Sequence, residues 1–256
     1  MATIATPGRT PLVSRFYVVM AWAFVAIAFG GFFGTYWLQL ARGTFRGGSP
    51  LLHLHGLLFS VWTLFFLSQT MLVANRKLRS HRSWGLLGIS LATGMVFVGM
   101  AVAIGGTQDR IAAGYGNAAL SFLIAPMTAI LGFGGFVAAG IANVRRPEWH
   151  KRFMLVATVS VIQAAVARFF FLAATGGGPG MRPGLAPPPP VERALTGAFA
   201  ADLLIVAAMI HDWRDQGRVH PAYWWGLGIM AAVQLGRTPF AYTEAWYRCA
   251  RFLLTF

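Results

Sequence analysis

Long apolar segments alternate with short polar segments along most of the chain. A helix needs about 20 apolar residues to cross the hydrocarbon core of a bilayer, and seven segments reach or approach that length. They are Phe16–Ala41, Leu51–Asn75, Trp84–Gly105, Ala118–Asn143, Phe153–Ala174, Ala194–His211 and Ala222–Tyr242. Beyond them, Trp246–Phe256 is typical of an amphipathic helix at the membrane surface. The pattern predicts an all-α, polytopic transmembrane helical bundle of about seven spans.

Two segments depart from this pattern. Residues 1–15 are polar and contain two prolines, which predicts a disordered cytoplasmic N-terminus. Residues 175–193 are rich in Gly and Pro, which predicts a partly extended loop outside the membrane. The first apolar segment is too long for the core of a signal peptide, so we expect an uncleaved first helix. Residues 16–256 are therefore expected to form a single transmembrane domain.

The composition agrees with a membrane location and excludes several classes of protein. Apolar residues make up 57% of the chain and charged residues 11%, against about 25% charged in soluble domains. The single cysteine, Cys249, excludes a disulfide scaffold and a zinc ribbon. The only lysines, Lys77 and Lys151, lie between spans, which excludes a retinal Schiff base. No Gly-x-Ser-x-Gly or His-Glu-x-x-His sequence indicates a hydrolase, and catalytic residues stay unassigned.

The net charge of +14 is distributed in short clusters between the apolar segments. Clusters of this kind set the orientation of a membrane protein in the bilayer. They do not form a continuous basic surface for nucleic acid. The expected partners are therefore membrane lipids and other membrane proteins. With the N-terminus in the cytoplasm, 12 of the 21 basic residues lie on the cytoplasmic side and 7 on the other. The positive-inside rule therefore predicts a cytoplasmic N-terminus and an external C-terminus.

Three predicted turns on the cytoplasmic side resemble one another. Each combines a polar helix end, a basic turn and a histidine at the start of the next helix. These histidines are His81, His150 and His220, which follow the polar helix end by six, seven and eight residues. The similarity predicts three helical hairpins of the same orientation, which we interpret as diverged parallel repeats after a first helix.

The same pattern predicts that four histidines gather at one membrane surface. His81, His150 and His220 are expected at one depth, with His211 nearby at the end of the sixth span. Imidazole is a common ligand of transition metals and haem iron, so the cluster is a candidate site for haem b or a transition metal. The alternative is that these rings only hydrogen-bond free backbone groups at helix ends.

Several polar side chains fall inside predicted spans, where ionisable groups usually have a function. Arg168 and Arg237 lie at the same depth, Asp202 lies within about one helical turn of it, and Gln234 shares a helix face with Arg237. His55 is expected at the rim of this region. One interpretation is a structural Arg168–Asp202 pair. The other is a pocket for a small anionic or lipid ligand, because two arginines face one aspartate.

The chain also resembles uncharacterised multi-pass membrane proteins found across bacteria, which implies a place in the inner membrane. The resemblance covers roughly Leu51 to Phe256 and rests on His55-Gly56, Gln69 followed by His81-Arg82 and Gly85, the run His150–Thr158 followed by Arg168, and the run Gly217–Pro221. A looser likeness is to haem proteins of the cytochrome b561 type, in which histidines on neighbouring helices ligate two haems. The fourth span contains no histidine, so only a haem on the inner side agrees with that likeness.

Three functional hypotheses follow from these features. The first is a haem- or metal-binding protein for electron transfer or assembly of a respiratory complex, based on the four histidines. The second is a binding or transport protein for a small anionic or lipid ligand, based on the intramembrane charges. The third is a structural membrane subunit. Four histidines at one depth are less expected by chance than the intramembrane charges, which favours the first hypothesis.

Overall fold

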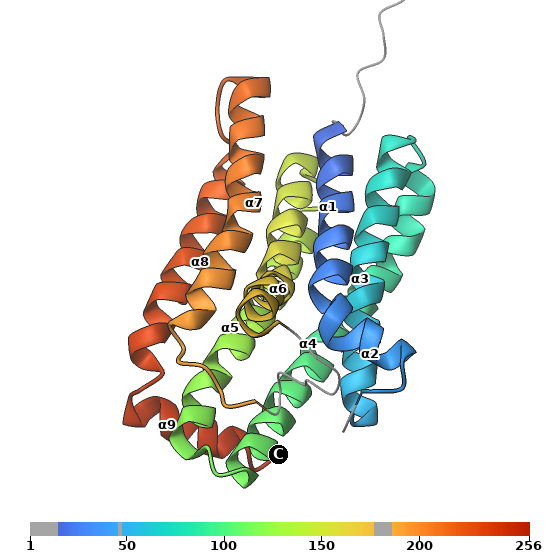
Figure 1. Ribbon diagram of the computed structural model, residues 1–256. Coiled ribbons are helices and arrows are strands. Elements are labelled where there is room, and N and C mark those ends of the chain that lie inside the picture. The colour runs from blue at the N-terminus through green and yellow to red at the C-terminus, as the bar shows by residue number, and fades with distance from the viewer. Residues whose placement is uncertain (1–14, 46–47, 177–185) are drawn as a thin grey trace, which may run out of the picture.

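The computed structural model describes residues 15–45, 48–176 and 186–256, which form helices and contain no strand. The helices are α1 (Arg15–Phe32), the π-helix η1 (Phe33–Trp37), α2 (Leu38–Ala41), α3 (Pro50–Ala74), α4 (Leu78–Ala112), α5 (Gly116–Ala142), α6 (Pro147–Thr175), α7 (Arg193–Gln216), α8 (Pro221–Phe240) and α9 (Glu244–Leu253) (Figure 1). The predicted all-helical bundle is confirmed. The predicted disorder before Arg15, and the middle of the predicted loop at 175–193, lie outside the described residues.

Six helical segments are long and apolar enough to cross a membrane. They are the continuous run α1–η1–α2 and the helices α3, α4, α5, α6 and α7. Each has at least 24 residues, which at 1.5 Å per residue exceeds a hydrocarbon core of about 30 Å. The predicted seventh span forms α8, a helix of 20 residues that is not among these six. A total of seven spans therefore stays a prediction.

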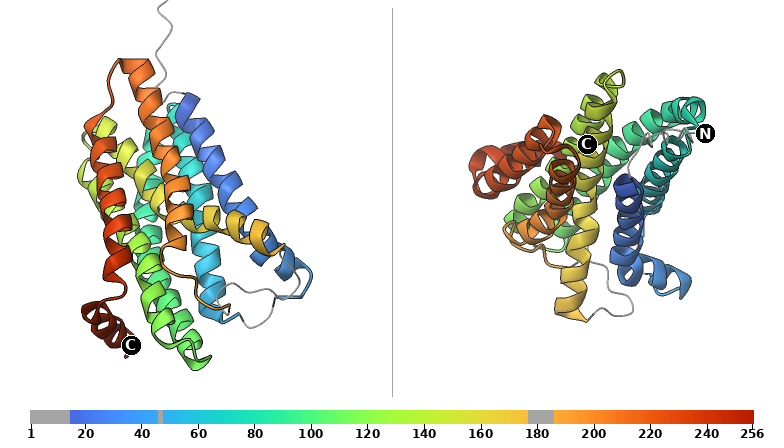
Figure 2. Two further views of the ribbon diagram at one scale, coloured as in Figure 1. Left: turned by 60° about the vertical axis from the view of Figure 1, so that its left-hand side comes forward. Right: turned by 90° about the horizontal axis from the view of Figure 1, so that it is seen from above.

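The three predicted hairpins are present and share one orientation. The turns between α3 and α4, α5 and α6, and α7 and α8 lie at the same end of the bundle, where α1 also begins (Figures 1 and 2). We call this end the turn end. Helix α9 lies across the opposite end, so the start of α1 and the C-terminus are on opposite sides. At the last turn, Gly217 ends α7 with a φ of 67° and Pro221 begins α8.

Helix α6 is the central element of the bundle. It contacts α1, α5, α7 and α8, and the side chains of Leu155, Val156 and Val159 are completely buried. Small residues allow this packing. A Cβ atom at Gly31 would collide with the Ala165 carbonyl of α6, so α1 and α6 pack with their backbones in close contact.

The outer surface is apolar, as expected for a surface in contact with lipid. Large apolar side chains such as Leu86, Phe97 and Trp225 are more than half exposed. Helix α9 is docked onto α5 by Trp246, whose indole N–H donates a hydrogen bond of 2.8 Å to the Leu120 carbonyl. The predicted amphipathic C-terminal helix is thus present, and the outward-facing large residues fit a bundle embedded in a bilayer.

Candidate functional site

A buried ion pair joins α6 to α7 at the turn end. The Arg152 guanidinium binds both carboxylate oxygens of Asp212, at 2.8 Å from Nε and 2.7 Å from Nη2. Both side chains are completely buried. The remaining donor group of Arg152 contacts the Glu148 carbonyl at 2.9 Å and the Glu148 carboxylate. The sequence pattern does not reveal this pair, because no sequence signal links positions 60 residues apart.

The same network reaches α8 and α1. The His220 backbone N–H donates to Asp212 at 3.2 Å, and the Arg152 guanidinium lies 5.5 Å from the Tyr223 ring centroid. The Tyr223 and Tyr17 hydroxyls are hydrogen-bonded at 3.1 Å. These groups are hydrogen-bonded or packed against one another. The arrangement therefore fits a structural role, in which it holds four helices together, better than a reactive site.

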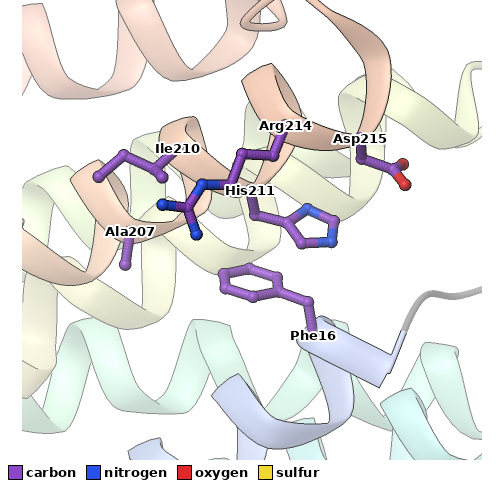
Figure 3. Close-up of a pocket in the computed structure, with 6 residues that line it drawn as sticks. All are labelled: Phe16, Ala207, Ile210, His211, Arg214 and Asp215. Atoms are coloured by element: carbon purple, nitrogen blue, oxygen red, sulfur yellow. The ribbon is translucent and has the colours of Figure 1, made fainter.

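The four candidate histidines separate into one pair and two single residues. The rings of His81 and His150 lie 6.3 Å apart at 79°. His211 stacks on Phe16 at 4.2 Å, and both line a hollow of about 380 Å³ beside Arg214. Figure 3 shows the residues that line it. Among the described residues, no group of three or more His, Cys, Asp or Glu is arranged to hold a metal ion. Of the four histidines expected at one membrane surface, His81 and His150 are in ring contact.

His220, unlike the other three histidines, caps a helix. Its ring packs against Trp149 at 4.9 Å, and its Nδ1 accepts a hydrogen bond of 3.2 Å from the Ala222 N–H. It therefore caps the start of α8. Burial lowers the pKa of His220, and the nearby positive charge of Arg152 lowers it further, which favours the neutral ring that accepts from Ala222.

The His81–His150 pair has two features that suit a ligand role. His150 Nδ1 lies 2.8 Å from the Gly140 carbonyl, an acceptor, so Nδ1 carries a proton, and in the neutral ring Nε2 has the lone pair. His81 Nδ1 is buried and has no hydrogen-bond partner. A ring held by a backbone carbonyl on one nitrogen is the usual arrangement of a metal-ligating histidine.

The intramembrane charges are grouped differently from the prediction. Asp202 accepts a hydrogen bond from Gln234 at 3.4 Å and interacts electrostatically with Arg237. Arg237 in turn donates to Thr128 Oγ1 at 2.9 Å. Within the described part of the chain, no ion pair links Arg168 to Asp202. The predicted Arg168–Asp202 pair is wrong, because the aspartate of α7 faces α8 and the arginine of α6 does not.

Asp202, Gln234 and Arg237 form a polar group that is more than nine-tenths buried. Their exposed fractions are 5%, 3% and 4%. Each also keeps one buried atom without a hydrogen-bond partner, namely Asp202 Oδ2, Gln234 Oε1 and Arg237 Nε. Unsatisfied polar atoms inside an apolar environment cost free energy, so these three atoms are candidates to bind a further polar group.

A groove of about 240 Å³ adjoins this polar group, between α5, α6 and α8. Gln234 and Arg237 lie at one end, and Gly132, Phe136 and Met230 are among the residues of the apolar wall. Its remaining lining residues are Thr128, Ala129, Leu131, Ser160, Gln163, Ile229 and Val233. Leu131, Ile229 and Val233 are at least 40% exposed, so the groove opens on the lipid-facing surface.

Arg168 and His55 lie in a different place, between α1, α3, α4 and α6. The Arg168 guanidinium lies 5.4 Å from the Phe32 ring centroid, and its electrostatic neighbours are the basic side chains His55 and Arg110. The five predicted ligand-binding residues therefore belong to two sites.

Comparison with models of protein families, with curated proteins and with solved structures finds no match for this chain.

Proposed function

We propose that this integral membrane protein binds a lipid-like ligand in the groove between α5, α6 and α8. The observation that carries the proposal is the position of Gln234 and Arg237 at one end of the groove, each with an unsatisfied buried atom. Asp202 lies behind them, where it accepts a hydrogen bond from Gln234. The ligand has an apolar chain along the groove and a small polar head at Gln234 and Arg237.

The chemistry of the groove defines the head group. Arg237 and Asp202 carry opposite charges close together, so the polar end of the groove is electrically balanced. A head group without net charge that donates to Gln234 Oε1 and accepts from Arg237 Nε suits this end of the groove. A hydroxyl group on an acyl or isoprenoid chain has this chemistry. The opening between Leu131 and Val233 gives such a chain access from the bilayer.

A matched pair of glycine variants on α5 tests the proposal. A Cβ atom at Gly132 would lie 3.9 Å from the nearest atom, Ser160 Cβ, so Gly132→Leu fits the backbone and fills the groove. A Cβ atom at Gly135 meets nothing within 4 Å, so Gly135→Leu adds the same bulk outside the groove. Wild type and both variants would be purified in detergent, extracted with organic solvent and analysed by mass spectrometry.

We expect one lipid-like species to be retained by wild type and by Gly135→Leu and to be lost from Gly132→Leu. Gln234→Leu should also lose it, whereas the same substitution at Gln69 in α3, outside the groove, should not. Equal retention by Gly132→Leu and wild type, or the absence of any bound species from wild type, would contradict the proposal.

The second candidate function is a haem- or metal-binding redox or respiratory-complex assembly protein, and the His81–His150 pair favours it. Two neighbouring imidazoles, with a lone pair on the neutral His150 ring and an unpartnered nitrogen on His81, suit a metal or haem iron. An absorption spectrum and metal analysis of the purified protein decide it. A Soret band or stoichiometric metal that is lost in both His81→Ala and His150→Ala supports this function, and their absence from wild type removes it.

A further inference from the structure

Arg168 lies among basic side chains from two other helices. On α3, His55 is close enough to interact electrostatically with Arg168 of α6, and so is Arg110 of α4. Each of the three is held against an aromatic ring. Arg168 lies 5.4 Å from the Phe32 centroid, Arg110 lies 5.2 Å from the Phe122 centroid, and the His55 ring lies 4.1 Å from Phe59.

No acidic side chain balances Arg168. The chain contains seven acidic residues, and the structure describes all of them. Asp212 and Glu148 bind Arg152, Glu244 binds Arg251, Glu192 accepts from Tyr242, Asp202 accepts from Gln234, and Asp109 and Asp215 are exposed. Among the described groups, the charge that acts on Arg168 is the like charge of Arg110.

Two polar nitrogen atoms at this place have no partner. Arg168 Nε, a donor, and His55 Nδ1, a donor when it is protonated, are buried and have no hydrogen-bond partner. A positive charge without a counter-ion in an environment of low dielectric constant is costly, so the folded protein gains stability when an anion supplies the missing charge. Guanidinium binds carboxylate and phosphate oxygens in two-point contacts, which suits both anions.

The position of Arg168 gives such an anion a route of entry. Helix α6 ends at Thr175, seven residues after Arg168, which places the guanidinium about 10 Å from the end of the helix opposite the turn end. Phe32, which covers Arg168, directly precedes the π-helix η1, a local widening that often occurs at functional sites. Thr35 within η1 is 4% exposed, and its hydroxyl has no partner.

We infer that Arg168, with His55 and Arg110, binds the carboxylate or phosphate group of an anionic ligand that enters from the side opposite the turn end. The site shares no residue with the groove of Asp202, Gln234 and Arg237, so it does not depend on the function proposed above. The anion is either a free solute or the head group of an acidic lipid.

The test compares thermal unfolding of the full chain in nanodiscs of phosphatidylcholine, with and without inorganic phosphate or butyrate. A second set of nanodiscs contains phosphatidylglycerol. Arg168→Gln removes the charge and keeps the length of the side chain. Arg193→Gln is the control, because Arg193 is an exposed arginine at the same end of the bundle.

We expect wild type and Arg193→Gln to be stabilised by the anion, and Arg168→Gln to bind it about tenfold more weakly or worse. Stabilisation by phosphate or butyrate in phosphatidylcholine identifies a free solute, and stabilisation by phosphatidylglycerol alone identifies a lipid head group. Without an anion, Arg168→Gln should be at least as stable as wild type, because an uncompensated charge has been removed.

Three results overturn the inference. The first is that no anion in either lipid stabilises wild type, and the second is that Arg168→Gln responds like wild type. The third is that Arg168→Gln loses the same stability with and without the anion, which makes Arg168 structural. If Arg168→Gln does not fold, His55→Gln takes its place, and an unchanged anion response in that variant also contradicts the site.

Discussion

At the scale of single residues, both side chains of the Arg152–Asp212 ion pair are buried, and each has hydrogen-bond partners. The Asp212 carboxylate accepts from the guanidinium and from the His220 N–H, while Glu148 supplies a second negative charge to Arg152. The attraction within such a pair adds little to the stability of the folded protein. Removing one member costs much more, because it leaves the other charge buried without a partner.

Asp212→Asn should destabilise the protein by about 3 kcal/mol, because it leaves the buried Arg152 charge with Glu148 as its one acidic partner. Unfolding in detergent by a denaturant would measure the change. The double variant Arg152→Met with Asp212→Leu should recover most of the loss, since apolar groups need no partner. A single variant as stable as wild type would show that water reaches this pair.

His220 makes a second residue-scale prediction, on pH. Its pKa in the folded protein is lowered by burial and by Arg152, while Asp212 and Glu148 oppose the shift and Lys151 adds to it. The unfolded chain therefore binds a proton more readily than the folded one as the pH falls through the normal histidine range near 6.5. Stability is complete above that pH and decreases below it.

Melting temperatures measured between pH 8 and pH 5 (roughly the histidine range) should fall more steeply for wild type than for His220→Asn. Asparagine keeps the N-cap of α8 and does not titrate in this range. Identical pH profiles for the two proteins would exclude His220 as the source of the pH dependence.

At the scale of elements, α6 holds the bundle together, and its contact with α1 depends on Gly31. A Cβ atom at Gly31 would overlap the Ala165 carbonyl, which belongs to rigid helix backbone and cannot rotate away. Gly31→Ala must therefore push α1 away from α6.

Gly31→Ala should lower the melting temperature and increase proteolysis of α1, with a cost of about 1–3 kcal/mol, as for other overpacked sites. Gly105→Ala in α4 is the matched control, because a Cβ atom there meets nothing within 4 Å. Alanine favours helix over glycine, so the control should be neutral or slightly stabilising. Equal behaviour of the two variants would mean that α1 does not pack against α6 as described.

At the scale of the whole molecule, the three hairpins turn at one end, α9 crosses the other, and the basic residues are concentrated at the turn end. The excess of basic residues predicts that the turn end is cytoplasmic.

Cysteines introduced at Asn75 and Ala113 in a Cys249→Ser background mark the two ends of the bundle, and both positions are exposed. We expect a membrane-impermeant thiol reagent applied to intact cells to label Ala113→Cys and to leave Asn75→Cys unlabelled until the membrane is opened. The reverse pattern would invert the orientation.

The sequence alone determined the fold class and the order of the helices. Apolar length and the position of polar turns are local properties, because a span must satisfy its own backbone hydrogen bonds within the bilayer. For the same reason the predicted segment Leu51–Asn75 differs from the helix Pro50–Ala74 by one residue at each end. The order of the hairpins along the chain also suffices to place His81, His150 and His220 at the same end of the bundle.

Only the tertiary structure decided which side chains meet. Depth along the membrane placed Arg168, Asp202 and Arg237 at one level, but depth does not say which way a helix is rotated. The rotation of α7 directs Asp202 toward Gln234 and Arg237. Arg168, on α6, lies instead near His55 and Arg110. Rotation is set by close packing of small residues against α6, a property of pairs of helices that no single segment of sequence carries.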